Sequence, residues 1–250
     1  MGVHVNGELW SKKVFLEAFE LFEQAIYDQS PNTRAKKLWS LINDKIGKVE
    51  LVVDESDGGN FNFSDYGYTQ MWVNYRDHAH RELLNSALQD VDQKMRNKAA
   101  PRNLALEKLS FEISLKPTLW DVNELGAIEW RIARYAITLA HEFVIHAAFH
   151  GYLFEQIASV GTADVGGLAH IKRLWNGLGD EREQHRAVFE NDQFGLYNEY
   201  RSVVNSMIRF THNEKLKKQL KEQYLADAEE HSSQESFLAA KEKVAKFFGF

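Results

Sequence analysis

The sequence predicts a helix-rich α+β domain in which a small, mostly antiparallel sheet precedes a buried helix. Two segments carry this prediction. Leu109–Lys116 alternates between apolar and polar residues, which is typical of a strand with one buried face. Glu124–Ile157 has helical periodicity and is apolar nearly all round over Ala136–Phe149, which is typical of a helix in the middle of a domain. The chain has no internal repeat and no low-complexity linker, so we expect one domain over residues 1–250.

The first half of the chain is expected to hold two helices and then the sheet. Within residues 1–46, apolar residues recur at spacings of three and four over Ser11–Asp28 and Arg34–Asn43, and Ser30–Thr33 separates these two helices. Residues 47–117 form the strand-rich part. Its expected elements are a strand at Lys48–Asp54, a two-stranded ribbon at Phe61–Tyr75 that turns near Asp65–Gly67, a helix at His80–Lys98 and the strand Leu109–Lys116.

The second half is expected to be helical. Residues 118–212 contain the buried helix, a glycine-containing loop and three further helices. After Glu124–Ile157, these are the loop Ser159–Gly167 and the helices His170–Leu178, Glu181–Glu190 and Phe194–Phe210. Residues 213–250 are charged; we expect a solvent-facing helix over Asn213–Glu235 and a docked aromatic end at Phe237–Phe250.

The composition narrows the classes of function. A net charge of −6 without a basic tract disfavours nucleic-acid binding. The chain has no cysteine, so any metal site must use histidine and carboxylate ligands. It also has no run of 18 apolar residues, and its amino-terminal segment lacks the basic region and long apolar core of a signal peptide. We therefore expect no membrane span, and a protein that is cytoplasmic or is secreted as part of a larger delivered protein.

A cluster of ionisable residues interrupts the apolar helix. His141, Glu142 and His146 form His-Glu-x-x-x-His, one residue longer than the His-Glu-x-x-His of zinc peptidases. Positions five apart lie about 140° from each other around a regular helix, so the two histidines do not share a face. A single π-type turn would bring them together, and such turns are frequent at functional sites. The motif therefore predicts a π-type turn if both histidines bind one ion.

The residue types predict a zinc site with an open coordination position. His141 and His146 supply two nitrogens, and Glu142 is placed to act as the general base that accepts a proton from the attacking water. The third ligand must come from elsewhere in the chain. His185 is our first choice, with Glu181 and His150 as alternatives.

The motif resembles that of a known peptidase family. His141-Glu-Phe-Val-Ile-His146 resembles the six-residue zinc motif of the dipeptidyl peptidase III family, in which one residue is inserted into the familiar pentapeptide. The resemblance implies that His141 and His146 are ligands and that Glu142 is the base. That family supplies a glutamate ligand from a second motif, Glu-Glu-x-x-x-Glu-like. Only Asp180-Glu-Arg-Glu-Gln-His185 stands in its place here.

The pattern is also similar to the metallopeptidase-like toxin domains at the ends of bacterial Rhs-type polymorphic toxins. The similarity rests on Ala140–Ala147 and on Asp180–His185. It implies a zincin-like fold, an effector that hydrolyses a peptide or protein substrate, and a cognate immunity protein as partner. In such a fold, Leu109–Lys116 would be an edge strand that pairs with extended substrate.

Other interpretations of the same residues stay open. Single histidines on apolar helices are usually core residues with hydrogen-bond partners, so the chain could be a non-enzymatic immunity or adaptor protein. The pairs Glu142/His146 and Glu181/His185 also suggest a di-metal carboxylate–histidine protein. Tyr197 could stabilise an oxyanion, as could its neighbours Tyr200 and Arg201, although core packing for the tyrosines and a surface charge for Arg201 explain these residues better.

Overall fold

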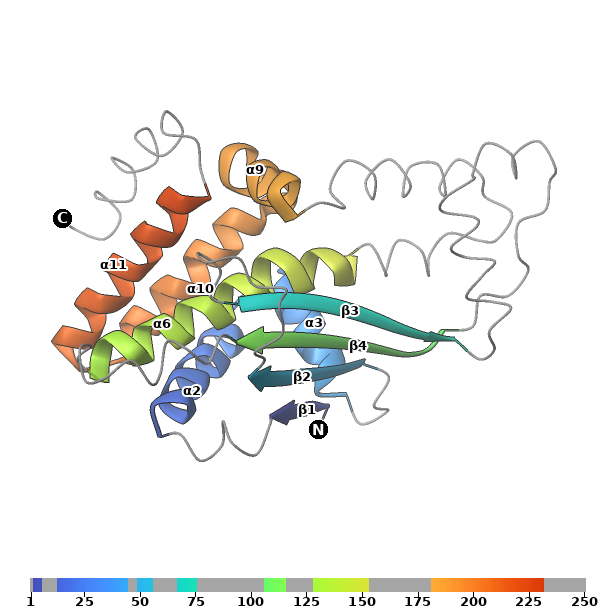
Figure 1. Cartoon of the computed structure of the whole chain (residues 1–250), viewed down its shortest axis with the longest axis horizontal. Coiled ribbons are helices and arrows are strands. Elements are labelled where there is room, and N and C mark those ends of the chain that lie inside the picture. The colour runs from blue at the N-terminus through green and yellow to red at the C-terminus, as the bar shows by residue number, and fades with distance from the viewer. Residues whose placement is uncertain are drawn as a thin grey trace.

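A computed structural model describes residues 2–5, 13–44, 49–55, 67–75, 106–115, 128–152 and 181–231 (Figure 1). These residues form a four-stranded sheet and a group of packed helices. In chain order the elements are β1 (Val3–Val5), α2 (Lys13–Tyr27), α3 (Arg34–Ile42), β2 (Val49–Glu55), β3 (Gly67–Tyr75), β4 (Leu106–Leu115), α6 (Ile128–His141), the π-helix η2 (Glu142–Ala147), α9 (Glu181–Asn191), the short 3₁₀-helix η3 (Gln193–Gly195), α10 (Leu196–Phe210) and α11 (Glu214–Glu230). The helix-rich α+β prediction is confirmed in this part of the chain.

The sheet is mixed, so the prediction of a mostly antiparallel sheet is wrong. Its strand order is β1-β2-β4-β3. The pairs β1·β2 and β2·β4 are parallel, and β3·β4 is antiparallel. The chain passes through α2 and α3 between β1 and β2, and a crossover of this kind returns the second strand in the direction of the first. The sequence did not predict β1, because three residues are too few to show periodicity.

The order of the strands also changes which of them is at an edge. β4 contains most of the predicted strand Leu109–Lys116, but it lies between β2 and β3. Its expected role as an edge strand is therefore wrong. β3 is the edge strand on that side of the described sheet, and it packs against η2.

One face of the sheet contributes to the hydrophobic core. Val49, Leu51 and Val53 of β2 are buried, whereas the alternate residues Glu50 and Val52 are only half-buried. This alternation places one set of side chains on the core face, as expected for a strand.

The buried helix lies between the sheet and the other helices. η2 contacts β3 and β4 on one side and α9 and α10 on the other, while α6 packs against α2 and α11 (Figure 1). Phe143 of η2 packs edge-on against Phe22 and Trp39, with ring centroids 5.5 Å apart in each pair. The expectation that this helix belongs in the middle of the protein is confirmed.

The helices predicted in the described ranges are present, but the solvent exposure expected for α11 needs correction. Thr33 caps α3, since its side chain accepts a hydrogen bond from the Lys36 amide. α11 is helical as expected, but it is not solvent-facing all round. One stripe of it is buried, comprising Leu216, Leu220, Tyr224 and Ala228.

Several expectations fall on other parts of the chain. The described residues do not include the first strand of the ribbon or the predicted helix His80–Lys98. They also exclude the loop Ser159–Gly167, the helix His170–Leu178 and the segment Phe237–Phe250. Within the ranges that are described, no helix is both long enough and apolar enough to cross a membrane.

Candidate metal centre

The helix widens at the motif, as the sequence predicts. Residues Glu142–Ala147 form a π-helix that follows directly on α6. At its end the Ala148 amide donates to the Phe143 carbonyl, a hydrogen bond that spans five residues instead of four. Residues five apart therefore share a face here. This turn lets His141 and His146 point to the same side, while Phe143 stays in the aromatic core.

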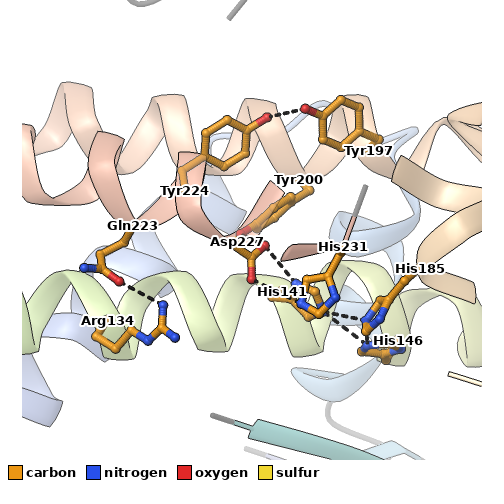
Figure 2. Close-up of polar contacts among 10 residues, drawn as sticks. All are labelled: Arg134, His141, His146, His185, Tyr197, Tyr200, Gln223, Tyr224, Asp227 and His231. Atoms are coloured by element: carbon orange, nitrogen blue, oxygen red, sulfur yellow. Dashed lines mark hydrogen bonds and ion pairs between the residues drawn. The ribbon is translucent and has the colours of Figure 1, made fainter. Parts of the chain in front are cut away.

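Three histidine nitrogens converge at this turn (Figure 2). The Nε2 atom of His141 lies 3.2 Å from that of His146 and 3.0 Å from that of His185, and the remaining pair is 2.9 Å apart. We call these three Nε2 atoms the histidine triangle. Zinc–nitrogen bonds of about 2.0–2.1 Å in a tetrahedral site place two nitrogens about 3.3 Å apart. The histidine triangle is within a few tenths of an ångström of that spacing.

In His141 and His146, a hydrogen bond at Nδ1 determines which ring nitrogen carries the proton. Nδ1 of His141 lies 3.0 Å from the Asp227 carboxylate, and Nδ1 of His146 lies 2.8 Å from the Gln184 side-chain oxygen. Both partners are acceptors, so both Nδ1 atoms donate. In the neutral rings, the two Nε2 atoms therefore present lone pairs to each other.

Protonation of a second ring nitrogen does not relieve the repulsion between these facing Nε2 lone pairs. Burial lowers the pKa of His146 well below its usual value, and neighbouring His141 lowers it further. Burial also lowers the pKa of His185, together with His146 and His141 beside it. A neutral His185 has one proton on one nitrogen, so it can donate to only one of the other two Nε2 atoms. A cation at the centre would satisfy all three lone pairs. Each of the three histidines belongs to a group of potential metal ligands, either His141, Glu142 and His146 or His141, His185 and His231.

Asp227 orients His141 from the opposite side to the triangle. Its Oδ2 accepts hydrogen bonds from His141 Nδ1 at 3.0 Å and from the Tyr200 hydroxyl at 2.8 Å. Burial alone would raise the pKa of the Asp227 carboxyl. The interaction with His141, and then those with His231 and Tyr200, bring it down to about 2. Asp227 is thus an anion at neutral pH, the kind of partner that metal-binding histidines usually have.

A fourth histidine stands beside the triangle. His231 follows the last residue of α11, and its ring centroid is 3.9 Å from that of His185 and 4.9 Å from that of His141. Ligand atoms of these three residues lie within 4.8 Å of one another. Its Nε2 is 3.8 Å from Asp227 Oδ1.

Glu142 is also at the centre. Its side chain is buried at the start of η2, and a carboxylate oxygen lies within 4.8 Å of ligand nitrogens of His141 and His146. The two groups of potential ligands, one with Glu142 and one with His231, share His141. In the described residues they therefore form a single centre.

The remaining candidates are His150, Glu181 and the tyrosines Tyr197 and Tyr200. His150 lies beyond the π-helix, with its ring 5.6 Å from that of Phe149. Glu181 begins α9, and the structure describes its backbone but not its side chain. Tyr200 donates its hydroxyl hydrogen to Asp227, and the Tyr197 hydroxyl accepts one from Tyr224.

Sequence reasoning missed Asp227, His231 and Gln184. Next to His185 in the chain, Glu183 is exposed and Gln184 contacts His146. A signal for α11 was present. Its apolar stripe has a spacing of four, and Asp227 and His231 continue that stripe at spacings of three and four.

Comparisons with known proteins add no relative. The chain matches no protein-family model, and no curated protein or solved structure is significantly similar to it. The resemblance to peptidase motifs therefore rests on the residues of the motif alone.

Proposed function

We propose that this protein is a zinc-dependent peptide hydrolase. In this proposal His141, His146 and His185 hold the zinc ion and Glu142 is the general base. The observation that carries the proposal is the histidine triangle, in which three buried Nε2 atoms lie 2.9–3.2 Å apart. The π-helical turn brings His141 and His146 together, and α9 supplies His185.

The ligand set favours zinc. Neutral imidazoles suit zinc, and three protein ligands with a fourth open position are characteristic of catalytic zinc sites. A zinc ion held here would lower the pKa of a bound water and polarise a substrate carbonyl. Asp227 and Gln184 support two of the three ligands through their Nδ1 atoms, as in other histidine metal sites.

Glu142 supplies the proton transfer that hydrolysis requires. It is adjacent to His141 in the chain and buried beside the histidine nitrogens. A carboxylate in this position accepts a proton from the attacking water and returns it to the leaving amine. Burial keeps bulk water away from the base, which strengthens its electrostatic interactions.

β3 is the strand on which an extended substrate would bind. It is the edge strand next to η2, and in the described sheet it is paired only with β4. An extended peptide could add to its outer side by backbone hydrogen bonds. The motif's similarity to Rhs-type toxin domains favours an effector that acts on a protein or peptide and has an immunity protein as partner.

Metal binding is the first test. Purified protein should contain about one zinc per chain by elemental analysis. Saturating zinc at about a hundred times its Kd should add about 2.7 kcal/mol to the free energy of unfolding of the metal-free protein. His146→Ala should abolish both effects, whereas His212→Ala, at an exposed residue outside the centre, should leave them unchanged. Protein without metal whose melting temperature ignores both zinc and chelator would contradict the proposal.

Hydrolysis is the second test. Zinc-loaded protein is incubated with a peptide library, and the products are identified by mass spectrometry. Glu142→Gln should keep the zinc stoichiometry and lose activity by at least about a hundredfold, because it removes the base and not a ligand. Glu183→Gln, at an exposed position, is the matched control. If Glu142→Gln cleaves as fast as the unchanged protein, Glu142 is not the base.

A further inference from the structure

We infer that His231 is a fourth, displaceable metal ligand that closes the centre from the end of α11. This inference rests on the proposed metal site and adds its regulation. With His231 bound, all four positions would be filled by protein. Four-ligand zinc sites of this kind are structural and unreactive, so hydrolysis would require His231 to leave.

The placement of His231 supports this role. Its ring centroid is 4.9 Å from that of His141, within the 4.8–5.2 Å range of the three ring pairs in the histidine triangle. Its ligand atom is within 4.8 Å of those of His141 and His185. Two nitrogens on one tetrahedral zinc ion are about 3.3 Å apart, so a shift of at most about 1.5 Å would bring the His231 nitrogen to that spacing from those of His141 and His185.

Its position in α11 allows such a shift. His231 is the C-cap of the helix, where one residue can move with little disturbance to the turns before it. Its Nε2 is 3.8 Å from Asp227 Oδ1, whereas Nδ1 of His141 is 3.0 Å from Asp227 and Nδ1 of His146 is 2.8 Å from the Gln184 side-chain oxygen. The side chain of His231 is 20% exposed, whereas that of His141 is 5% exposed, and His146 is buried. Of these histidines, His231 is therefore the one that solvent or substrate can displace.

Asp227 contacts both His141 of the histidine triangle and His231. One of its carboxylate oxygens accepts from His141, and the other faces His231. The same residue of α11 thus orients a ligand of the triangle and stands next to the histidine that would cover it. Displacement of the end of α11 would open the fourth position without removing the three ligands from α6, η2 and α9.

The test counts ligands, and it does not depend on activity. The full chain is loaded with one equivalent of zinc, and X-ray absorption spectroscopy gives the number of imidazoles on the metal. We expect four in the unchanged protein and in His212→Ala, and three plus one oxygen in His231→Ala. In cobalt-loaded protein, azide should change the visible spectrum of His231→Ala at a concentration at least tenfold lower than for the unchanged protein.

The outcomes separate this inference from the proposed function. Three imidazoles in both proteins, with equal azide affinity, would overturn the role of His231 and leave the metal centre intact. No bound metal in the unchanged protein would overturn both. Should His231→Ala fail to fold, the imidazole count of the unchanged protein and the spectrum of His231→Gln decide the question.

Discussion

Replacing Asp227 by asparagine tests whether the centre is built for a metal. The carboxylate accepts hydrogen bonds from His141 at 3.0 Å and from Tyr200 at 2.8 Å. Asparagine has nearly the same shape but no charge, and its NH₂ group can donate to Nδ1. That would move the ring proton of His141 to Nε2, where the metal should bind. We therefore expect Asp227→Asn to weaken zinc binding without preventing the protein from folding.

The size of the effect follows from the two contacts. A hydrogen bond to a charged acceptor contributes about 1.5–3 kcal/mol, against about 1 kcal/mol for a neutral one. Loss of the charge opposite His141 thus costs about 0.5–2 kcal/mol, and more when a metal cation polarises the ring. Substitutions of such supporting residues weaken metal binding about 10- to 100-fold, which corresponds to about 1.4–2.7 kcal/mol. The two ranges overlap at about 1.4–2 kcal/mol, so we expect a loss of zinc affinity of roughly 10- to 30-fold.

The assay is competition for zinc between the protein and a chromophoric chelator at one neutral pH. Tyr200→Phe removes one hydrogen bond to Asp227 but keeps the carboxylate, so its loss should be smaller. Asp192→Asn, before α10, should have no effect. Zinc affinity of Asp227→Asn within twofold of the unchanged protein would show that this carboxylate does not tune a metal ligand, and our account of the centre would be wrong.

Three further predictions concern the stability of the metal-free protein. Burial lowers the pKa of His150 to about 4 from its usual value of about 6.5, so the unfolded chain takes up this proton first as the pH falls. The free energy of unfolding should therefore decrease by roughly 3 kcal/mol between about pH 6.5 and pH 4. In urea titrations His150→Phe should remove that part of the slope, and parallel slopes would contradict the assignment. Asn213 caps α11 through the amides of Lys215 and Leu216, so Asn213→Ala should cost about 1 kcal/mol in thermal unfolding and Asn213→Asp much less. A Cβ at Gly2 would lie 2.5 Å from two backbone oxygens, so Gly2→Ala should lower the melting temperature; no change would argue against the pairing of β1.

Local patterns were sufficient to predict most elements. Helical spacing in Lys13–Tyr27 and alternation in β4 follow from which side chains must be buried, and such patterns are visible within one segment. The π-type turn was predictable too. It follows from a chemical requirement, because two histidines five apart can reach one ion only if the helix widens.

Pairing between distant segments was not predictable in the same way. The relative direction of β1 and β2 depends on the crossover through α2 and α3. The residues of the two strands give no indication of this crossover. The edge position of β3 depends on β4 entering the sheet beside β2, and nothing in the alternation of β4 shows how many neighbours it has.

The candidate metal centre was likewise predictable only in part. His141, Glu142 and His146 could be identified from the chain alone, since they lie on one helix and their spacing suggests metal chemistry. The sequence also indicated His185, because donors are concentrated around it. That His185 completes the triangle, and that α11 brings Asp227 and His231 to it, became evident from the packing of the helices. The physical reason is that a helix's own periodicity shows which of its faces is buried, whereas the partner of that face depends on how the whole chain packs.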